Sequence, residues 1–218
     1  DKTAEADDHQ KKVFWSMDLF SYLFGSFVAA AYFCLFQPFI TLWLGDWWLL
    51  PMAYVFWFCL NEYVGWNHRM LGSYRAVLGH FEQDQWFMVA SGVSNLVLSF
   101  VLVIPFGLAG VTAATVFAHC LMWLGRAKVV FGGFMRGCGG RYLRVQLCHL
   151  ATLALCMGGS YWLCSLLPGG IPGMAARVLV VCVVPNAINL ACYGFSSDAE
   201  YLRGRAAELW RRIRRKGA

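Results

Sequence analysis

Residues 86–124 read WFMVASGVSNLVLSFVLVIPFGLAGVTAATVFAHCLMWL and contain no aspartate, glutamate, lysine or arginine. A helix needs about 20 apolar residues to cross the hydrocarbon core of a bilayer, so this stretch is long enough for two crossings. Pro105-Phe106-Gly107 lies near its middle and marks a turn between them. The stretch therefore predicts a pair of transmembrane helices, at about Trp86 to Phe106 and Leu108 to Leu124.

The same pattern recurs on both sides of this pair. Four more spans are predicted, and they cover about Leu19 to Leu44, Trp48 to Trp66, Val145 to Leu167 and Pro172 to Phe195. Within the six spans, only Glu62 and Arg177 are charged at pH 7. We therefore expect an all-α membrane protein in which residues 14–196 form about six transmembrane helices.

The composition of the whole chain agrees with this prediction. The 218 residues are 59% hydrophobic and 14% charged, and their mean hydropathy is +0.54. So little polar surface excludes an ordinary soluble enzyme and also excludes disorder. Most of the nine cysteines lie in apolar runs, where they are typical of free thiols that act as small hydrophobes. No C-x-x-C spacing occurs, so no metal site is predicted.

The basic residues orient the predicted spans. If the N-terminus is cytoplasmic, 17 of the 18 lysines and arginines lie in or beside the cytoplasmic segments, and Arg177 is the exception. Cytoplasmic loops of membrane proteins carry such an excess of lysine and arginine. The sequence therefore predicts a multi-pass protein with both termini on the cytoplasmic side of the membrane.

The two ends of the chain differ from the middle. Residues 1–13 are polar and predict a solvated cytoplasmic loop that enters the first span. Residues 197–218 predict a basic amphipathic helix with Asp198 and Glu200 in its first turn. Such a helix binds the anionic inner leaflet electrostatically, or it is a positive-inside stop signal without a further role.

Polar side chains inside the spans are the candidate functional residues. Each is costly in hydrocarbon, so it usually faces a cavity or a partner. Seven residues are candidates for lining a cavity or for coupling transport to an ion: Asn61, Glu62, Asn95, His119, Arg177, Asn186 and Asn189.

Each of these candidates also has a structural interpretation. Glu62 is a coupling site for H⁺ or Na⁺, or else a carboxylate that reaches the interface near Arg69. Arg177 meets an anionic headgroup or substrate, or it is an interfacial anchor. Hydrogen bonding between helices explains Asn95 and His119 as well as a cavity does.

Catalytic patterns are absent from the sequence. It contains no G-x-x-x-x-G-K-[ST], no H-E-x-x-H and no pair of acids one helical turn apart inside a span. Ser94 and His119 lack the G-x-S-G surroundings of an intramembrane serine protease. We therefore expect no enzyme, no catalytic residue and no bound cofactor.

A series of motifs resembles one transporter family. The stretch Gln37-Pro-Phe-Ile-Thr-Leu-Trp-Leu-Gly-Asp46 resembles the P-F-I-x-L-W-L-G segment of bacterial polysaccharide exporters. The family's next segments follow in the same order over about residues 14–135, and they are matched by Arg75, Gly79 and Phe81, by Ser94-Asn95-Leu96 with Leu98-Ser99, and by Gly107, Gly110, Val111 and Thr115. The chain thus resembles the Wzx-like O-antigen and teichoic-acid export flippases of the multidrug/oligosaccharidyl-lipid/polysaccharide superfamily. Ala114 departs from the pattern, which has glycine before Thr115.

This resemblance implies a fold, a location and a function. The chain would be the C-terminal lobe of a two-lobed flippase in the bacterial inner membrane, and an amino-terminal lobe would complete it. Its substrate would be a polyprenyl-pyrophosphate-linked glycan, moved by alternating access, with anionic membrane lipids as further partners and no nucleic acid.

Two other function classes stay open. One is a lobe of a MATE-type drug/cation antiporter or of a peptidoglycan-precursor flippase, and the other is a six-helix membrane scaffold that transports nothing.

Overall fold

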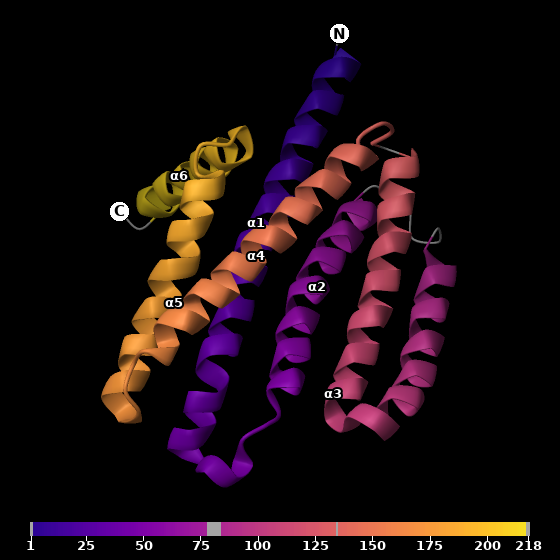
Figure 1. Ribbon diagram of the computed structural model, residues 1–218. Coiled ribbons are helices and arrows are strands. Elements are labelled where there is room, and N and C mark those ends of the chain that lie inside the picture. The colour runs from indigo at the N-terminus through magenta and orange to yellow at the C-terminus, as the bar shows by residue number, and fades with distance from the viewer. Residues whose placement is uncertain (1, 78–83, 134, 217–218) are drawn as a thin grey trace.

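The computed structural model describes residues 2–77, 84–133 and 135–216, and all regular structure in these ranges is helical (Figure 1). The prediction of an all-α protein is therefore confirmed. The elements in chain order are α1 (Lys2–Trp43), the short 3₁₀ helix η1 (Asp46–Trp48), α2 (Met52–Val77), α3 (Gln85–Gly133), α4 (Gly139–Ser165), α5 (Gly170–Tyr193) and α6 (Ser197–Lys216). Gly79 and Phe81, which belong to the resemblance above, lie outside the described residues.

α3 is a hairpin of two helical arms, residues 85–106 and 108–133. The backbone of Gly107 has φ 55° and ψ −135°, outside the helical region, and the chain reverses there (Figure 1). Glycine adopts such a conformation without steric cost. Gly110 and Gly125 let the arms approach closely, because a Cβ atom at either position would collide with Leu102 or Phe87 of the first arm. The turn predicted at Pro105-Phe106-Gly107 is thus present.

Four helices of the described part are long and apolar enough to cross a membrane: residues 8–43 of α1, then α3, α4 and α5. They are compatible with a membrane protein. α3 counts as one of these four helices although it consists of two arms, and α2 is not one of the four. Asn61, Glu62 and Arg69 are among the polar residues that lower the mean hydropathy of α2. Each of the six predicted spans lies largely within a helix, but the number of crossings stays a prediction.

The N-terminal segment differs from its prediction. The solvated loop expected over residues 1–13 is wrong, since α1 is helical from Lys2 onward. Lys12 and Asp8 form an ion pair of 2.8 Å one helical turn apart. Such pairs stabilise a helix that a neighbouring apolar segment has already nucleated.

α1 is the central helix of the bundle. It contacts α2, α4, α5 and α6, whereas α3 packs on α2. The main core cluster includes Tyr22, Val55, Tyr63 and Leu153, from α1, α2 and α4. The first arm of α3 lies at the edge of the bundle, and most of its side chains are exposed (Figure 1).

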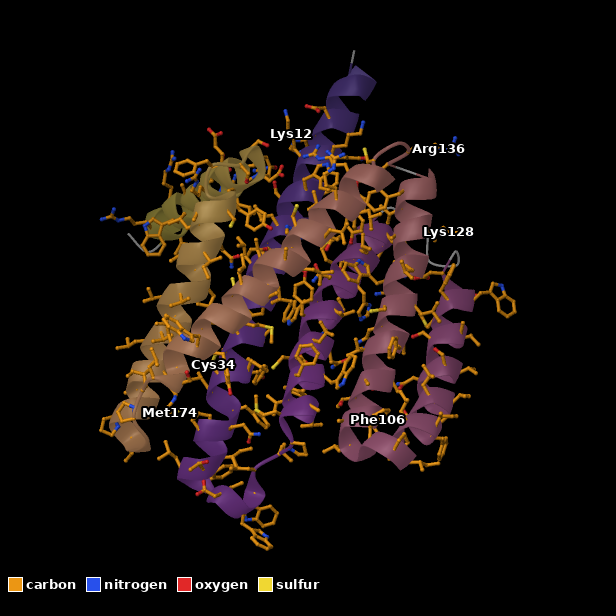
Figure 2. The ribbon with its side chains drawn as sticks, in the orientation of Figure 1. Lys12, Cys34, Phe106, Lys128, Arg136 and Met174 are labelled. Atoms are coloured by element: carbon orange, nitrogen blue, oxygen red, sulfur yellow. The ribbon has the colours of Figure 1, made fainter. Side chains whose placement is uncertain are left out.

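The two ends of the bundle differ in charge. Both chain termini lie toward one end (Figure 1), and Lys12, Lys128 and Arg136 lie toward that same end, whereas Phe106 and Met174 lie at the other (Figure 2). This is the distribution that the predicted topology requires. The side of the membrane on which each end lies stays a prediction.

Candidate functional site

α1 carries a row of polar side chains on its buried face. Asp18, Tyr22 and Ser26 follow one another at intervals of four residues, and each is at most 1% exposed. Residues four apart lie on the same face of a helix. Because this face meets α4 and α5, polar groups of those helices surround the row.

Tyr22 is the centre of this buried row. Its hydroxyl donates to Asn189 Oδ1 over 2.9 Å and lies 2.6 Å from Thr152 Oγ1. Asn189 Nδ2 in turn donates to Ser26 Oγ over 3.1 Å. The ring of Tyr22 stacks on His149, with centroids 4.0 Å apart. These contacts tie α1, α4 and α5 together through side chains that are otherwise rare in apolar helices.

Asp18 meets Gln146 at one end of the row. Gln146 Nε2 lies 3.0 and 3.1 Å from the two carboxylate oxygens of Asp18. Both side chains are buried, and the described residues offer Asp18 no ion pair with lysine or arginine. Within the same part of the chain, Gln146 Oε1 is buried without a hydrogen-bond partner. We call the whole set the polar network: Asp18, Tyr22, Ser26, Gln146, His149, Thr152, Asn189 and Tyr193.

The Asp18–Gln146 pair can accept a proton. A carboxylate only accepts hydrogen bonds, whereas a protonated carboxyl also donates one. If Asp18 is protonated, its O–H can donate to Gln146 Oε1 while Gln146 Nε2 donates to the other carboxyl oxygen. Protonation would thus remove a buried charge and supply a partner to an unsatisfied acceptor.

A second group of charged side chains lies between α2 and α3. Asp84, directly before α3, is fully buried between two arginines. Arg75 forms an ion pair with one carboxylate oxygen, and Arg126 Nε lies 3.3 Å from the other. The pairing offsets the cost of burying these charges.

Arg126 also fixes the state of a histidine. Its Nη1 lies 2.8 Å from His68 Nδ1 and donates to the carbonyl oxygen of His68 over 2.8 Å. A guanidinium has only donors, so Nδ1 of His68 accepts, and the ring is neutral with its proton on Nε2. The His119 ring lies 4.7 Å from that of His68. We call this set the Asp84 cluster: Asp84, Arg75, Arg126, His68 and His119.

Three of the seven predicted site residues lie in or near these two groups, and a fourth, Asn61, precedes Glu62 in α2. Asn189 belongs to the polar network and His119 to the Asp84 cluster. Glu62 interacts electrostatically with His119. Asn61 is half-buried, and its Oδ1 has no hydrogen-bond partner among the described residues.

The other three have local partners. Asn95 Oδ1 accepts a hydrogen bond of 3.5 Å from Thr115 and so joins the two arms of α3. Arg177 donates to the carbonyl oxygens of residues 167 and 168, at 2.9 Å each, and closes the turn between α4 and α5. Asn186 donates to a carbonyl of its own helix. The seven residues therefore do not converge on one cavity.

Reasoning from the sequence missed the most buried charges of the bundle. Asp18 precedes the first predicted span by one residue, and Asp84 precedes the third by two, so both lie just outside the spans and neither was a candidate. The spacing held a signal, because Asp18, Tyr22 and Ser26 repeat every four residues. Gln146 and His149 repeat at three on α4, and both lie on its buried face.

Comparisons with known proteins leave the family open. A scan against protein-family models gave no match, and neither did searches of curated proteins and of solved structures. Within the described part of the chain, no group of three or more histidine, cysteine, aspartate or glutamate side chains could hold a metal ion.

Proposed function

We propose that this chain is one lobe of a transporter that moves a lipid-linked oligosaccharide across the bacterial inner membrane by alternating access. The observation that carries the proposal is the polar network buried between long apolar helices. Ionisable and amide groups at such positions are costly in a membrane, and they typically mark substrate or ion pathways.

The substrate assignment rests on the resemblance and on chemistry. Moving a polyprenyl-pyrophosphate-linked glycan means hiding a pyrophosphate and many hydroxyl groups from hydrocarbon, while the polyprenyl tail stays in lipid. A water-filled cavity between two lobes does this if polar and cationic side chains line it. This lobe would supply one wall, with Asn61 and Glu62 of α2 and His119 of α3 as candidate lining residues, and an amino-terminal lobe would supply the other.

Asp18 is the group that we propose couples transport to protons. In one state Asp18 is ionised and accepts from Gln146 Nε2; in the other it has taken up one proton and donates to Gln146 Oε1. Since α1 and α4 carry the two partners, the proton changes the contact between two packed helices. A change in the contact of two packed elements is what alternating access requires.

The test is export of surface polysaccharide by a flippase-deficient bacterial strain that expresses the reading frame containing this chain. Wild-type protein should restore export. Asp18→Asn removes the titratable carboxyl at nearly constant volume, so export should fall to background while the protein still reaches the membrane. Glu62→Gln should reduce export or change its pH dependence. The matched control is Asp46→Asn, which changes an exposed aspartate of η1 and should leave export normal.

The outcomes separate the parts of the proposal. A wild-type frame that fails to restore export argues against a flippase and for the membrane scaffold. Normal export by the Asp18→Asn variant contradicts the coupling role of Asp18. Normal export by the Glu62→Gln variant over a broad pH range makes Glu62 an interfacial side chain.

The buried carboxylate also favours a second candidate, a lobe of a drug/cation antiporter. Such a protein needs an acid that exchanges a proton or Na⁺ for a cationic substrate. Proton-driven efflux of a cationic dye by the same frame, without restored polysaccharide export, would select this alternative.

A further inference from the structure

An open groove is lined by residues 13–24 of α1, residues 66–73 of α2 and residues 201–205 of α6. Figure 1 shows that α6 lies toward the end of the bundle that holds the chain termini. Its volume is about 500 Å³. Its wall on α1 is largely apolar, with Met17, Phe20 and Phe24 all exposed. No side chain that lines the groove belongs to the polar network or to the Asp84 cluster.

Two arginines line the same groove from opposite helices. Arg69 of α2 lies over the ring of Trp66, and Arg205 of α6 lies over the ring of Tyr201, each 5.3 Å from the ring centroid. Stacking on an aromatic ring of its own helix limits the freedom of each guanidinium. Both cations are thereby positioned before any ligand arrives.

The hydrogen bonds of these arginines leave donors for a ligand. Arg69 Nε donates to the Gly65 carbonyl over 2.8 Å, and among the described residues its terminal nitrogens meet no side-chain acceptor. Arg205 Nε donates to Tyr201 over 3.1 Å, and its Nη1 lies 3.2 Å from Glu208 in an exposed pair three residues apart. Exposed pairs of this kind are weak.

The remaining polar lining of the groove carries no negative charge. It consists of hydroxyl groups from three helices: Ser16, Ser21, Ser73 and Tyr201. The three serine hydroxyls already donate to the carbonyl oxygens of residues 12, 66 and 69, so the two guanidiniums and the Tyr201 hydroxyl are the donors left for a ligand. These donors suit a phosphate, because arginine binds phosphate oxygens with paired donors. The exposed aromatic and methionine side chains of α1 suit an apolar chain attached to that phosphate.

We propose that this groove binds one anionic phospholipid, with its phosphate between Arg69 and Arg205 and its acyl chains along α1. The occupant is a lipid because the lining combines cations with an apolar wall that a free phosphate would leave empty. The bound lipid bridges α2 and α6 and so holds the basic helix against the bundle. This site is independent of transport and stands or fails separately from the function proposed above.

The test counts lipids retained by the full-length chain in detergent, by native mass spectrometry. Phosphatidylglycerol and phosphatidylcholine with identical acyl chains are the probes. Wild-type protein should retain one phosphatidylglycerol in preference to phosphatidylcholine. Each arginine is worth about a fivefold change in affinity near an anionic surface, so Arg69→Gln with Arg205→Gln should weaken retention about 30-fold.

A matched control separates the groove from general attraction to the basic helix. Arg211→Gln with Arg212→Gln removes the same charge from exposed positions of α6 outside the groove, and retention should stay within about twofold of wild type. Ser73→Leu keeps every charge but fills the groove, so it should lower retention. Inorganic phosphate in excess should not displace the lipid.

Four results would overturn the proposal. They are equal loss of lipid in both double variants, equal retention of both lipids by the wild type, normal retention by the Ser73→Leu variant, and displacement by inorganic phosphate. The last result would assign the groove to a free anion.

Discussion

At the scale of single residues, Gly72 of α2 provides the space that Arg126 occupies. A Cβ atom at Gly72 would lie 2.7 Å from Nη1 and 2.8 Å from Cζ of Arg126. The Arg126 side chain is 13% exposed and is held by Asp84 and His68, so it cannot move aside without losing these bonds. The absence of a side chain at Gly72 is therefore part of the Asp84 cluster.

We predict that Gly72→Ala destabilises the protein. Alanine gains up to about 1 kcal/mol over glycine inside a helix, but loss of a hydrogen bond to a charged group costs about 1.5–3 kcal/mol. The net expectation is a loss of about 0.5–2 kcal/mol, measured by reversible unfolding in detergent. Gly92→Ala is the control, since nothing lies within 4 Å of a Cβ atom there. A Gly72→Ala variant as stable as the Gly92→Ala variant would contradict this account.

Single residues were also the scale at which sequence reasoning was weakest. Glu62 and Arg177 stand out in the sequence because they interrupt apolar runs. Asp18 and Asp84 do not, because each lies just outside such a run. Asp18 is buried against Gln146, which lies 128 residues away in the sequence. Asp84 is buried against Arg126, which lies 42 residues away. Hydropathy along the chain holds no information about such partners.

At the scale of elements, α6 is a capped helix docked on α1. The Ser196 hydroxyl accepts a hydrogen bond of 3.2 Å from the Ala199 amide, which caps the helix. Ala199 and Leu202 pack on the main core cluster. Asp198 lies 3.9 Å from Arg141 of α4, and its side chain is 27% exposed.

We predict that docking of α6 weakens as the pH rises. Burial raises the pKa of the Asp198 carboxyl, and the nearby Arg141 guanidinium opposes this with a smaller lowering. The docked carboxyl therefore holds its proton more tightly than the undocked one. Docking is strongest below the ordinary aspartate pKa of about 3.9, and it loses stability as the pH rises through the raised pKa.

Hydrogen exchange of the α6 amides between pH 4 and pH 7, corrected for intrinsic rates, measures this effect. Asp198→Asn should remove the pH dependence of protection. Glu200→Gln, which changes an exposed acid in the same turn, should keep it. Persistence of the full pH dependence in the Asp198→Asn variant would assign it to another group.

Elements were predicted better than residues. The turn of α3 was predicted from Pro105-Phe106-Gly107, because proline and glycine break helices and this pair lies near the middle of a long apolar run. In the structure the chain reverses at Gly107. The helical start of α1 was missed because a charged segment has no apolar periodicity. Its helix is an extension of the buried segment that begins near Phe14.

At the scale of the whole molecule, the sequence predicts which segments are apolar but not which of them touch. The central place of α1 follows from small and polar residues on several of its faces, such as Ser26, Ala29 and Ala30, all fully buried. Small side chains let neighbouring helices approach closely. Their arrangement around α1 depends on complementary surfaces of helices that lie far apart in the sequence.

The last prediction concerns how this bundle lies in the membrane. The termini and the turn between α3 and α4 share one end, whereas the turns after α1 and α4 share the other (Figure 1). Translocating lysine and arginine against the membrane potential is unfavourable, so the basic end should be cytoplasmic.

We therefore expect a Cys-free variant with Arg136→Cys to be labelled by an impermeant thiol reagent only from the cytoplasmic side. Asp46→Cys and Gly169→Cys, both at the opposite end, should be labelled only from outside. All nine native cysteines are free thiols, so replacing them breaks no disulfide. Labelling of the Gly169→Cys variant from the cytoplasmic side alone would invert the topology, and it would place the basic helix α6 on the outer face, where the anionic inner leaflet could not bind it.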